Sequence, residues 1–71
     1  MDEIRLLDVV ALMEDLESKG LRRGEVGTIV EKWAEGVFEV EFSDDSGKAY
    51  AFASLRPEQI MKLHFRHDAA A

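Results

Sequence analysis

The stretch from residue 38 to residue 42 reads Phe-Glu-Val-Glu-Phe, so apolar and charged side chains alternate without a break. Successive side chains of an extended chain point to opposite faces, so this pattern predicts a strand with one face in a core and the other in water. A second run, Val26–Trp33, is rich in the β-branched residues that strands favour. Gly36 lies between the two runs and can adopt the positive φ of a tight turn. Together these features predict a β-hairpin.

Turn-forming residues mark the limits of further strands around this hairpin. Ser43–Gly47 consists entirely of residues that favour turns, and Pro57 suits the first position of a single helical turn. The predicted strands are Leu6–Met13, Val26–Trp33, Val37–Ser43, Lys48–Leu55 and Ile60–His64, with a long loop at Glu14–Glu25 and a helical turn at Pro57–Gln59.

The first twenty residues fit two different structures. Apolar residues recur there at helical spacing, and Asp2 and Gly20 could cap the two ends of a helix over residues 2–19. The competing interpretation is a strand followed by the long loop. The local pattern by itself favours the helix. The residues at helical spacing are Leu6, Val9, Val10, Met13 and Leu16.

The composition limits how such a chain can be stabilised and what it can bind. The 71 residues are enough for one domain, and without cysteine neither disulfides nor thiolate metal sites can support it. Nine Lys and Arg against fifteen Asp and Glu give a net charge of −6, opposite to that of a typical phosphate-binding domain. The acidic start is not followed by a long apolar run, so we expect no signal peptide, no transmembrane helix and a cytoplasmic location.

Two stretches resemble a family of short bacterial proteins of unknown function. They read LLDVVALMEDLESKGLRRGEVGTIVE and, further on, GVFEVEFSDDSGKAYAFASL, and the likeness extends over Leu6–Leu63. Members of that family are similar to small SH3-like barrels. Residues 24–30 are also similar to the glycine-containing strand start of the KOW motif in ribosomal and transcription proteins. The chain has Glu17 where the family often has proline, a residue that would forbid a continuing helix.

The resemblance implies an all-β fold, a small five-stranded SH3-like barrel with one short 3-10 turn near the C-terminus. Such a barrel needs five strands, so Leu6–Met13 is assigned as a strand in preference to the helix. Closure would remove the open edges of so small a sheet. We expect the domain to occupy residues 1–66 and a flexible tail to follow at residues 67–71. The expected core is Val10, Leu12, Leu21, Val26, Ile29, Phe38, Val40, Phe42, Ala51, Ala53, Leu55, Ile60 and Leu63.

Two short segments carry metal-binding residue types without the spacing that a metal site requires. His64–Asp68 holds two imidazoles and a carboxylate, but residues three apart in a strand face opposite sides, and the segment lies near a chain end. Asp44–Gly47 resembles part of a calcium loop but lacks the distant glutamate, which indicates an ordinary turn. A closed five-stranded barrel also has no interior volume for a substrate. We therefore expect no enzymatic activity, no cofactor and no bound metal.

Basic side chains in the long loop are the candidates for contact with nucleic acid. Three charges make a small electrostatic footprint, and acidic residues flank them, so a mixed solvated loop is the more ordinary interpretation. The candidate residues are Lys19, Arg22 and Arg23.

Two other sets of side chains predict a protein-binding surface. Glutamates on neighbouring strands would form an acidic face, which is either the wet side of the sheet or a docking face for a basic protein. Aromatic side chains that alternate with inward alanines would point outward and form the nucleus of an interface, whereas the opposite register would bury them. The acidic face is Glu31, Glu39 and Glu41, and the predicted interface is Trp33, Tyr50 and Phe52.

These features predict a non-enzymatic protein-interaction module. The expected partner is a protein: a second copy of the chain, in a homodimer that tightens with salt, or a basic protein. An immunity or antitoxin protein, or the product of a mobile gene cassette, is a more specific form of this hypothesis. The alternative is a nucleic-acid-binding KOW-like barrel. Contact with a membrane is not expected.

Overall fold

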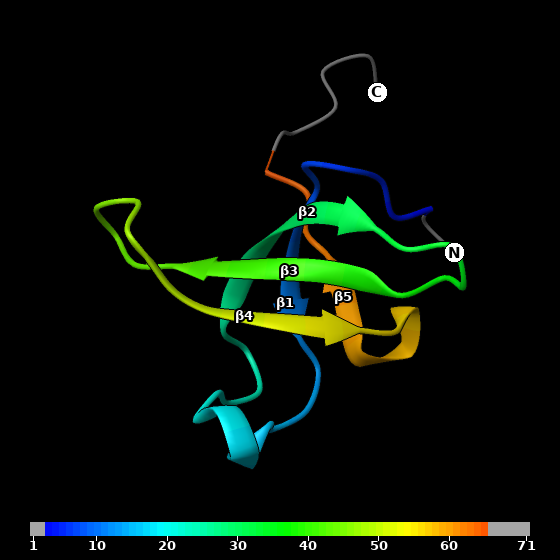
Figure 1. Cartoon of the computed structure of the whole chain (residues 1–71). Helices are drawn as coiled ribbons and strands as arrows, with labels where there is room; N and C mark the ends of the chain where they lie inside the picture. The colour runs from blue at the N-terminus through cyan, green and yellow to red at the C-terminus, as the bar shows by residue number, and fades with distance from the viewer. Residues whose placement is uncertain (1–2, 66–71) are drawn as a thin grey trace.

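The computed structural model describes residues 3–65, which form one strongly bent antiparallel sheet (Figure 1). The strands are β1 (Val9–Leu12), β2 (Val26–Lys32), β3 (Phe38–Ser43), β4 (Ala49–Leu55) and β5 (Ile60–Lys62), and two 3-10 turns are η1 (Glu17–Lys19) and η2 (Pro57–Gln59). The spatial order of the strands is β4-β3-β2-β1-β5. The all-β class, the five strands and the turn before the last strand are confirmed, whereas η1 was not predicted.

The N-terminal segment contains strand β1, as the preferred interpretation predicted, and the competing interpretation of a helix over residues 2–19 is wrong. β1 pairs with β2 on one side and with β5 on the other, so contacts with distant segments override the local helical spacing. β1 is shorter than the predicted Leu6–Met13, because Leu7 has a φ of 71°, which interrupts the extended backbone. The apolar stripe is not buried as a unit either, since Leu6 is 56% exposed and Met13 is 42% exposed.

The sheet folds back on itself without closing into a hydrogen-bonded barrel. β1 and β5 run across the back of β3 and β4, and β2 connects the two halves (Figure 1). A β-bulge between Ile29 and Glu31 disturbs the pairing of β2 with β3, and bulges increase the local bend. β4 and β5 end the strand order and do not pair with each other in the described part of the chain. The predicted closure is thus not made by hydrogen bonds, and both strands keep an open edge.

The core lies between the two halves of the bent sheet and largely follows the prediction. Ala51 and Leu63 are only partly buried, and Val26 is wrong as a core residue because it is 43% exposed. Val26 pairs with Ala11 on the outer side of the sheet. The Ala11 side chain is nevertheless buried there, with an exposure of only 8%. The buried cluster is Val10, Leu12, Leu21, Ile29, Phe38, Val40, Phe42, Ala53, Leu55 and Ile60.

The long loop between β1 and β2 is folded against this core. Leu16 and Leu21 exchange two backbone hydrogen bonds of 2.8 and 3.1 Å, which close the chain around η1. This closure directs the Leu21 side chain into the core, where it is 3% exposed. At the base of the loop, the Leu12 N–H donates to the Glu25 carbonyl at 2.8 Å, and the Gly24 N–H donates to the Leu12 carbonyl at 2.7 Å.

Gly27→Ala tests the close approach of β2 to β3. A Cβ atom on Gly27 would lie 2.6 Å from Cγ1 of Val40 and 2.9 Å from the carbonyl oxygen of Glu41, so side chain and backbone would both have to move. We expect the free energy of unfolding to fall by about 2 kcal/mol, as in overpacked cores.

The matched control for this variant is Gly36→Ala. Gly36 has a φ of +78° but no atom within 4 Å of its Cβ position, so the loss should be about 1 kcal/mol, from the left-handed backbone alone. Urea titration measures both values. A loss for Gly27→Ala no larger than that for Gly36→Ala would contradict the close contact.

Candidate functional site

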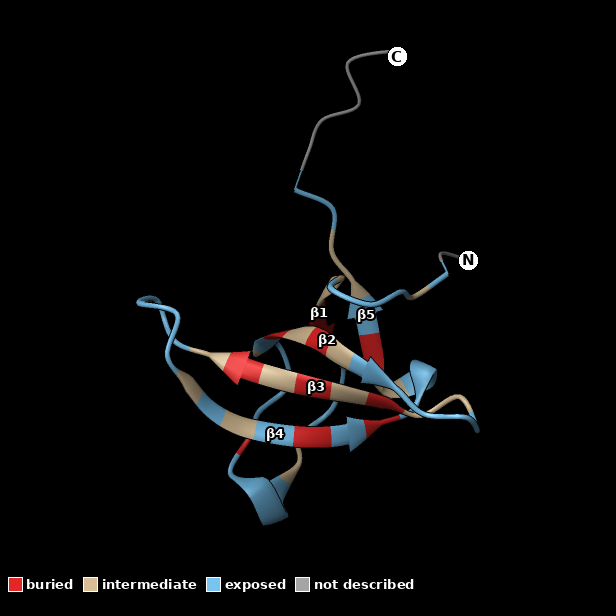
Figure 2. Cartoon of the chain, turned by 45° about the horizontal axis from the view of Figure 1, so that its top comes forward, coloured by how far each residue is buried: buried red, intermediate tan, exposed pale blue. Residues whose placement is uncertain are grey.

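The outward side of β4 carries two exposed aromatic side chains. Tyr50 is 52% exposed and Phe52 is 49% exposed, whereas Ala53 and Leu55 are buried in the core. Figure 2 shows exposed positions interrupting the more buried ones along β4. The outward register preferred for the aromatic pair is therefore the one observed, and both rings are accessible to a partner.

The strand register brings Phe52 next to the predicted acidic residues. Glu41 is the direct cross-strand partner of Phe52. Two pairs further along, on the same side of the sheet, the Ser54 hydroxyl donates a hydrogen bond of 2.6 Å to the carboxylate of Glu39. Glu31 in β2 pairs in turn with Glu39. The sequence presented the acidic and the aromatic residues as separate features, and the structure places them on one surface.

The Tyr50 side chain is fixed by a hydrogen bond from its hydroxyl to Oε1 of Glu25 at 2.7 Å. This bond raises the pKa of Tyr50 above its ordinary value, and desolvation adds to the effect. The same hydrogen bond is the largest cause of a lowered pKa at Glu25. The second cause is a hydrogen bond of 2.6 Å that the Arg22 backbone N–H donates to Oε2 of Glu25. The Glu25 carboxylate thereby joins the outward side of β4 to the end of the long loop.

Val26 is a member of this surface that the sequence did not reveal. It directly follows Glu25, and its exposed side chain lies on the outward side of β2. The signal was present in the alternation, since Val26 lies three positions before Ile29, which faces the core. Glu31, two positions after Ile29, faces outward because the β-bulge between them shifts the register. We use the term outer face for Val26, Glu31, Glu39, Glu41, Tyr50 and Phe52.

Trp33, the third predicted interface residue, is exposed but lies apart from the aromatic pair. Its backbone N–H donates to the Val37 carbonyl at 2.7 Å, whereas Phe52 pairs with Glu41. Val37 and Glu41 are four residues apart along the same chain segment, a separation of roughly 13 Å in a strand. The structure thus does not bring Trp33 together with Tyr50 and Phe52.

The three basic candidates lie in the long loop among acidic neighbours. Lys19 ends η1, and Arg22 and Arg23 follow the closure of the loop, all three being exposed. The Arg23 backbone N–H donates to Oδ1 of Asp15 at 2.8 Å, so a carboxylate lies beside the basic pair. The loop therefore presents charges of both signs.

The turn between β3 and β4 is organised by its own residues. Oδ1 of Asp44 accepts hydrogen bonds from the Ser46 N–H, the Ser46 hydroxyl and the Lys48 N–H at 2.8 to 3.0 Å. These bonds, led by the one from the Lys48 backbone, lower the pKa of Asp44. Residues 3–65 contain no group of three metal-ligating side chains. His67 and Asp68, which completed the metal-binding hypothesis, lie outside the described residues, as does the predicted tail at 67–71.

A family model for a domain of unknown function, DUF4926, matches residues 6–62. The chain belongs to the DUF4926 family. The match includes all five strands of the sheet and agrees with the predicted membership of a family of unknown function. No curated protein and no solved structure matches the DUF4926 chain. Within residues 3–65, none of the helical turns is long enough to cross a membrane.

Removal of the Glu25 charge should lower the pKa of Tyr50 in this DUF4926 chain. Tyr50 is the sole tyrosine, so the absorbance of tyrosinate during an alkaline titration reports this side chain alone. In the native chain we expect a pKa above 10, and Glu25→Gln should bring it back toward that value. Glu31→Gln removes the same charge elsewhere on the outer face and should leave the titration unchanged. An identical titration for Glu25→Gln and the native chain would show that the hydrogen bond is not formed in solution.

Proposed function

We propose that this DUF4926 chain is a non-enzymatic protein-binding module whose outer face docks on a basic protein. The observation that carries the proposal is the direct pairing of exposed Phe52 with Glu41 across β3 and β4. An accessible aromatic ring within a row of carboxylates supplies apolar contact area and a negative field at the same place. This is the combination that recognises a basic surface with an apolar centre.

The charge of the chain favours a basic partner over an acidic one. The net charge is −6, and Glu31, Glu39 and Glu41 add their charges beside the aromatic pair. Such a field accelerates encounter with basic proteins and repels acidic ones. An immunity or antitoxin protein that neutralises a basic toxin in the cytoplasm would use a surface of this kind. The small, acidic, cysteine-free character of the chain supports this more specific form of the proposal.

Self-association through the outer face is the second candidate, and the exposed aromatic pair favours it. Covering Tyr50 and Phe52 would remove apolar area from water in a domain with little stability in reserve. A two-fold contact would also bring one acidic row toward the other, so it requires salt to screen the repulsion. The two candidates therefore differ in the sign of their salt dependence.

The nucleic-acid-binding alternative receives less support from the same geometry. It rested on the glycine spacing of residues 24–30 and on the basic loop. Gly27 faces atoms of Val40 and Glu41 that leave no room for a Cβ, and Gly24 has a φ of 96°, so the fold itself accounts for both glycines. The basic loop carries acidic residues beside its arginines.

Phe52→Glu separates apolar docking from simple charge attraction. The variant adds a negative charge, so a purely electrostatic contact with basic proteins would tighten. If the partner instead covers the exposed ring, its loss should weaken binding about tenfold or more. The measurement is equilibrium binding of the labelled chain to a panel of basic and acidic proteins at increasing salt. We expect binding to basic members only, weakened by salt. A preference for acidic members, or unchanged binding by Phe52→Glu, would refute the proposal.

Trp33→Glu is the matched control for this experiment. Trp33 is as exposed as Phe52 and the substitution adds the same charge, but it lies away from the aromatic pair. We expect its binding to equal or slightly exceed that of the native chain.

Sedimentation at micromolar concentration addresses self-association with the same variants. A dimer that tightens with salt and is lost with Phe52→Glu would establish the second candidate, and a monomer throughout would eliminate it.

A further inference from the structure

Within residues 3–65, the last strand, β5, pairs with another strand along one edge only. Its inner edge is fixed to β1, since the Met13 N–H donates to the Gln59 carbonyl at 2.8 Å and the Leu63 N–H donates to the Val9 carbonyl at 2.9 Å. Backbone groups of a strand alternate in direction, so those of Met61 face β1 and those of the residues on either side face away.

Three backbone groups are therefore left on the outward edge of β5. The Ile60 N–H donates to the Pro57 carbonyl, whereas the Ile60 carbonyl and both polar groups of Lys62 point away from β1. β5 ends the strand order, so no strand of the described chain lies along this edge. We use the term β5 edge for these groups of Ile60 and Lys62.

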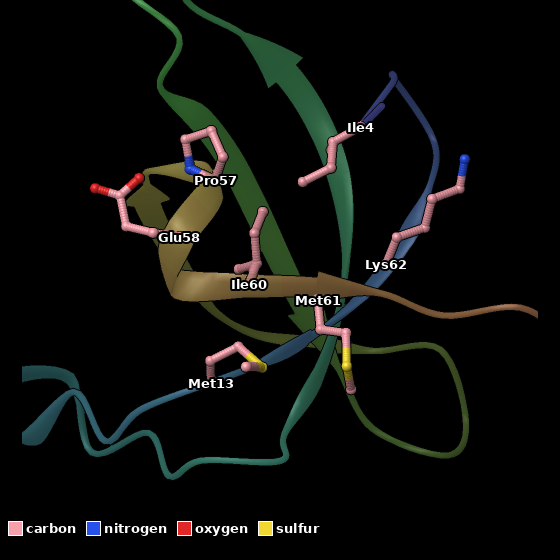
Figure 3. A pocket seen from close by; sticks show the side chains of 7 residues that line it. All are labelled: Ile4, Met13, Pro57, Glu58, Ile60, Met61 and Lys62. Atoms are coloured by element: carbon pink, nitrogen blue, oxygen red, sulfur yellow. The ribbon is translucent and has the colours of Figure 1, made fainter. Parts of the chain in front are cut away.

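An apolar hollow of about 490 Å³ adjoins the β5 edge. Figure 3 shows Ile4, Pro57 and Ile60 on one side of the β5 ribbon and Met13 and Met61 on the other. Met13 is 42% exposed and Met61 is 49% exposed. The volume falls in the range of about 300–1,000 Å³ found for ligand sites. Apolar side chains therefore flank the edge above and below the strand.

We propose that the β5 edge binds an extended peptide as an added sixth strand. Strand addition requires two features: free main-chain groups, which provide affinity, and pockets on both sides, which accept alternate side chains and provide specificity. The β5 edge supplies the first, and the flanking isoleucine, proline and methionine side chains supply the second. The peptide would place successive side chains against Ile4 and Pro57 on one side and against the two methionines on the other.

Charge complementarity selects a basic, apolar peptide. Among the described residues, the one cation that lines the hollow is Lys62, and its ammonium group is already engaged by Oδ2 of Asp8 and the Glu3 carbonyl, both at 3.3 Å. The carboxylate of Glu58 also lines the hollow, but the Arg56 guanidinium pairs with it at 3.0 Å. The negative charge that remains at this site is that of Glu14, which lies beside the start of β5 and accepts a hydrogen bond from Gln59 at 3.0 Å. The net charge of −6 acts in the same direction.

A second copy of the chain fits this edge less well than a peptide. β5 has only three residues, so edge-to-edge pairing of two copies would form few hydrogen bonds while bringing together two chains of charge −6. The site is also separate from the outer face, because none of the outer-face residues lines the hollow. Phe52→Glu should therefore leave peptide binding unchanged, so this inference and the proposed function can fail independently.

The probe is a short acetylated peptide of alternating isoleucine and lysine, and amide hydrogen exchange of the intact chain is the measurement. In the free chain the Lys62 amide should exchange much faster than the paired Met61 amide. Bound peptide should slow exchange at Lys62 by about tenfold or more. Equal protection of both amides in the free chain would show that a second copy occupies the edge and would overturn the proposal, as would peptide binding that leaves the Lys62 amide unchanged.

Lys62→Pro and Lys62→Ala form the matched pair of variants. Both remove the ammonium group, but only proline removes the outward N–H, and proline is tolerated on an open strand edge. We expect the affinity of Lys62→Pro for the peptide to be about tenfold below that of Lys62→Ala, and equal affinities would refute strand addition. Met61→Glu keeps the backbone intact and provides a second check if the proline variant unfolds. Met61→Glu should lower the affinity for the alternating isoleucine–lysine peptide. An undiminished affinity would count against contact between the peptide and the apolar side chains beside β5.

Discussion

The fold depends on the close approach of Gly27 to β3. Gly27 lies in the middle strand, where it pairs with Val10 of β1 on one side and with Phe42 of β3 on the other. The space that its side chain would fill is taken by Val40 and Phe42. The two halves of the sheet can therefore fold over one another and enclose a core, although residues 3–65 form no helix layer to cover an open sheet and the chain has no cysteine for a disulfide.

The same alternation that builds the core also builds the outer face. With Val40 and Phe42 turned inward, Glu41 must turn outward, and the β3–β4 register places Phe52 beside it. The surface is thus a geometric consequence of burying the opposite side chains, as well as a candidate for binding. Its distinguishing feature is that two outward positions of β4, Tyr50 and Phe52, are aromatic, where a solvated strand would ordinarily carry polar residues such as the neighbouring Ser54.

The sequence predicted those parts of the structure that depend on neighbouring residues. It was less informative where contacts between distant segments determine the backbone conformation. The alternation of β3 and the positive φ of Gly36 could be read directly, and both are confirmed. Helix and strand could not be separated for residues 2–19, because pairing with β2 and β5 decides between them. Val26 was assigned to the core together with Ile29, although residues three apart in a strand face opposite sides. The hydrogen bond between Tyr50 and Glu25 joins residues that are 25 positions apart, and no local pattern could predict it.

The closure of the long loop has a consequence for how this chain could vary. The base of the loop is held by the backbone bonds between Leu12 and residues 24 and 25, and its middle by those between Leu16 and Leu21. The bonds between Leu16 and Leu21 enclose the short segment around η1, and no residue of η1 is buried in the core. Doubling the length of a flexible loop costs only about 0.6 kcal/mol in closure entropy. The loop tip at Glu17–Lys19 is therefore the position where we expect an inserted peptide or an evolutionary insertion to leave β1 and β2 undisturbed.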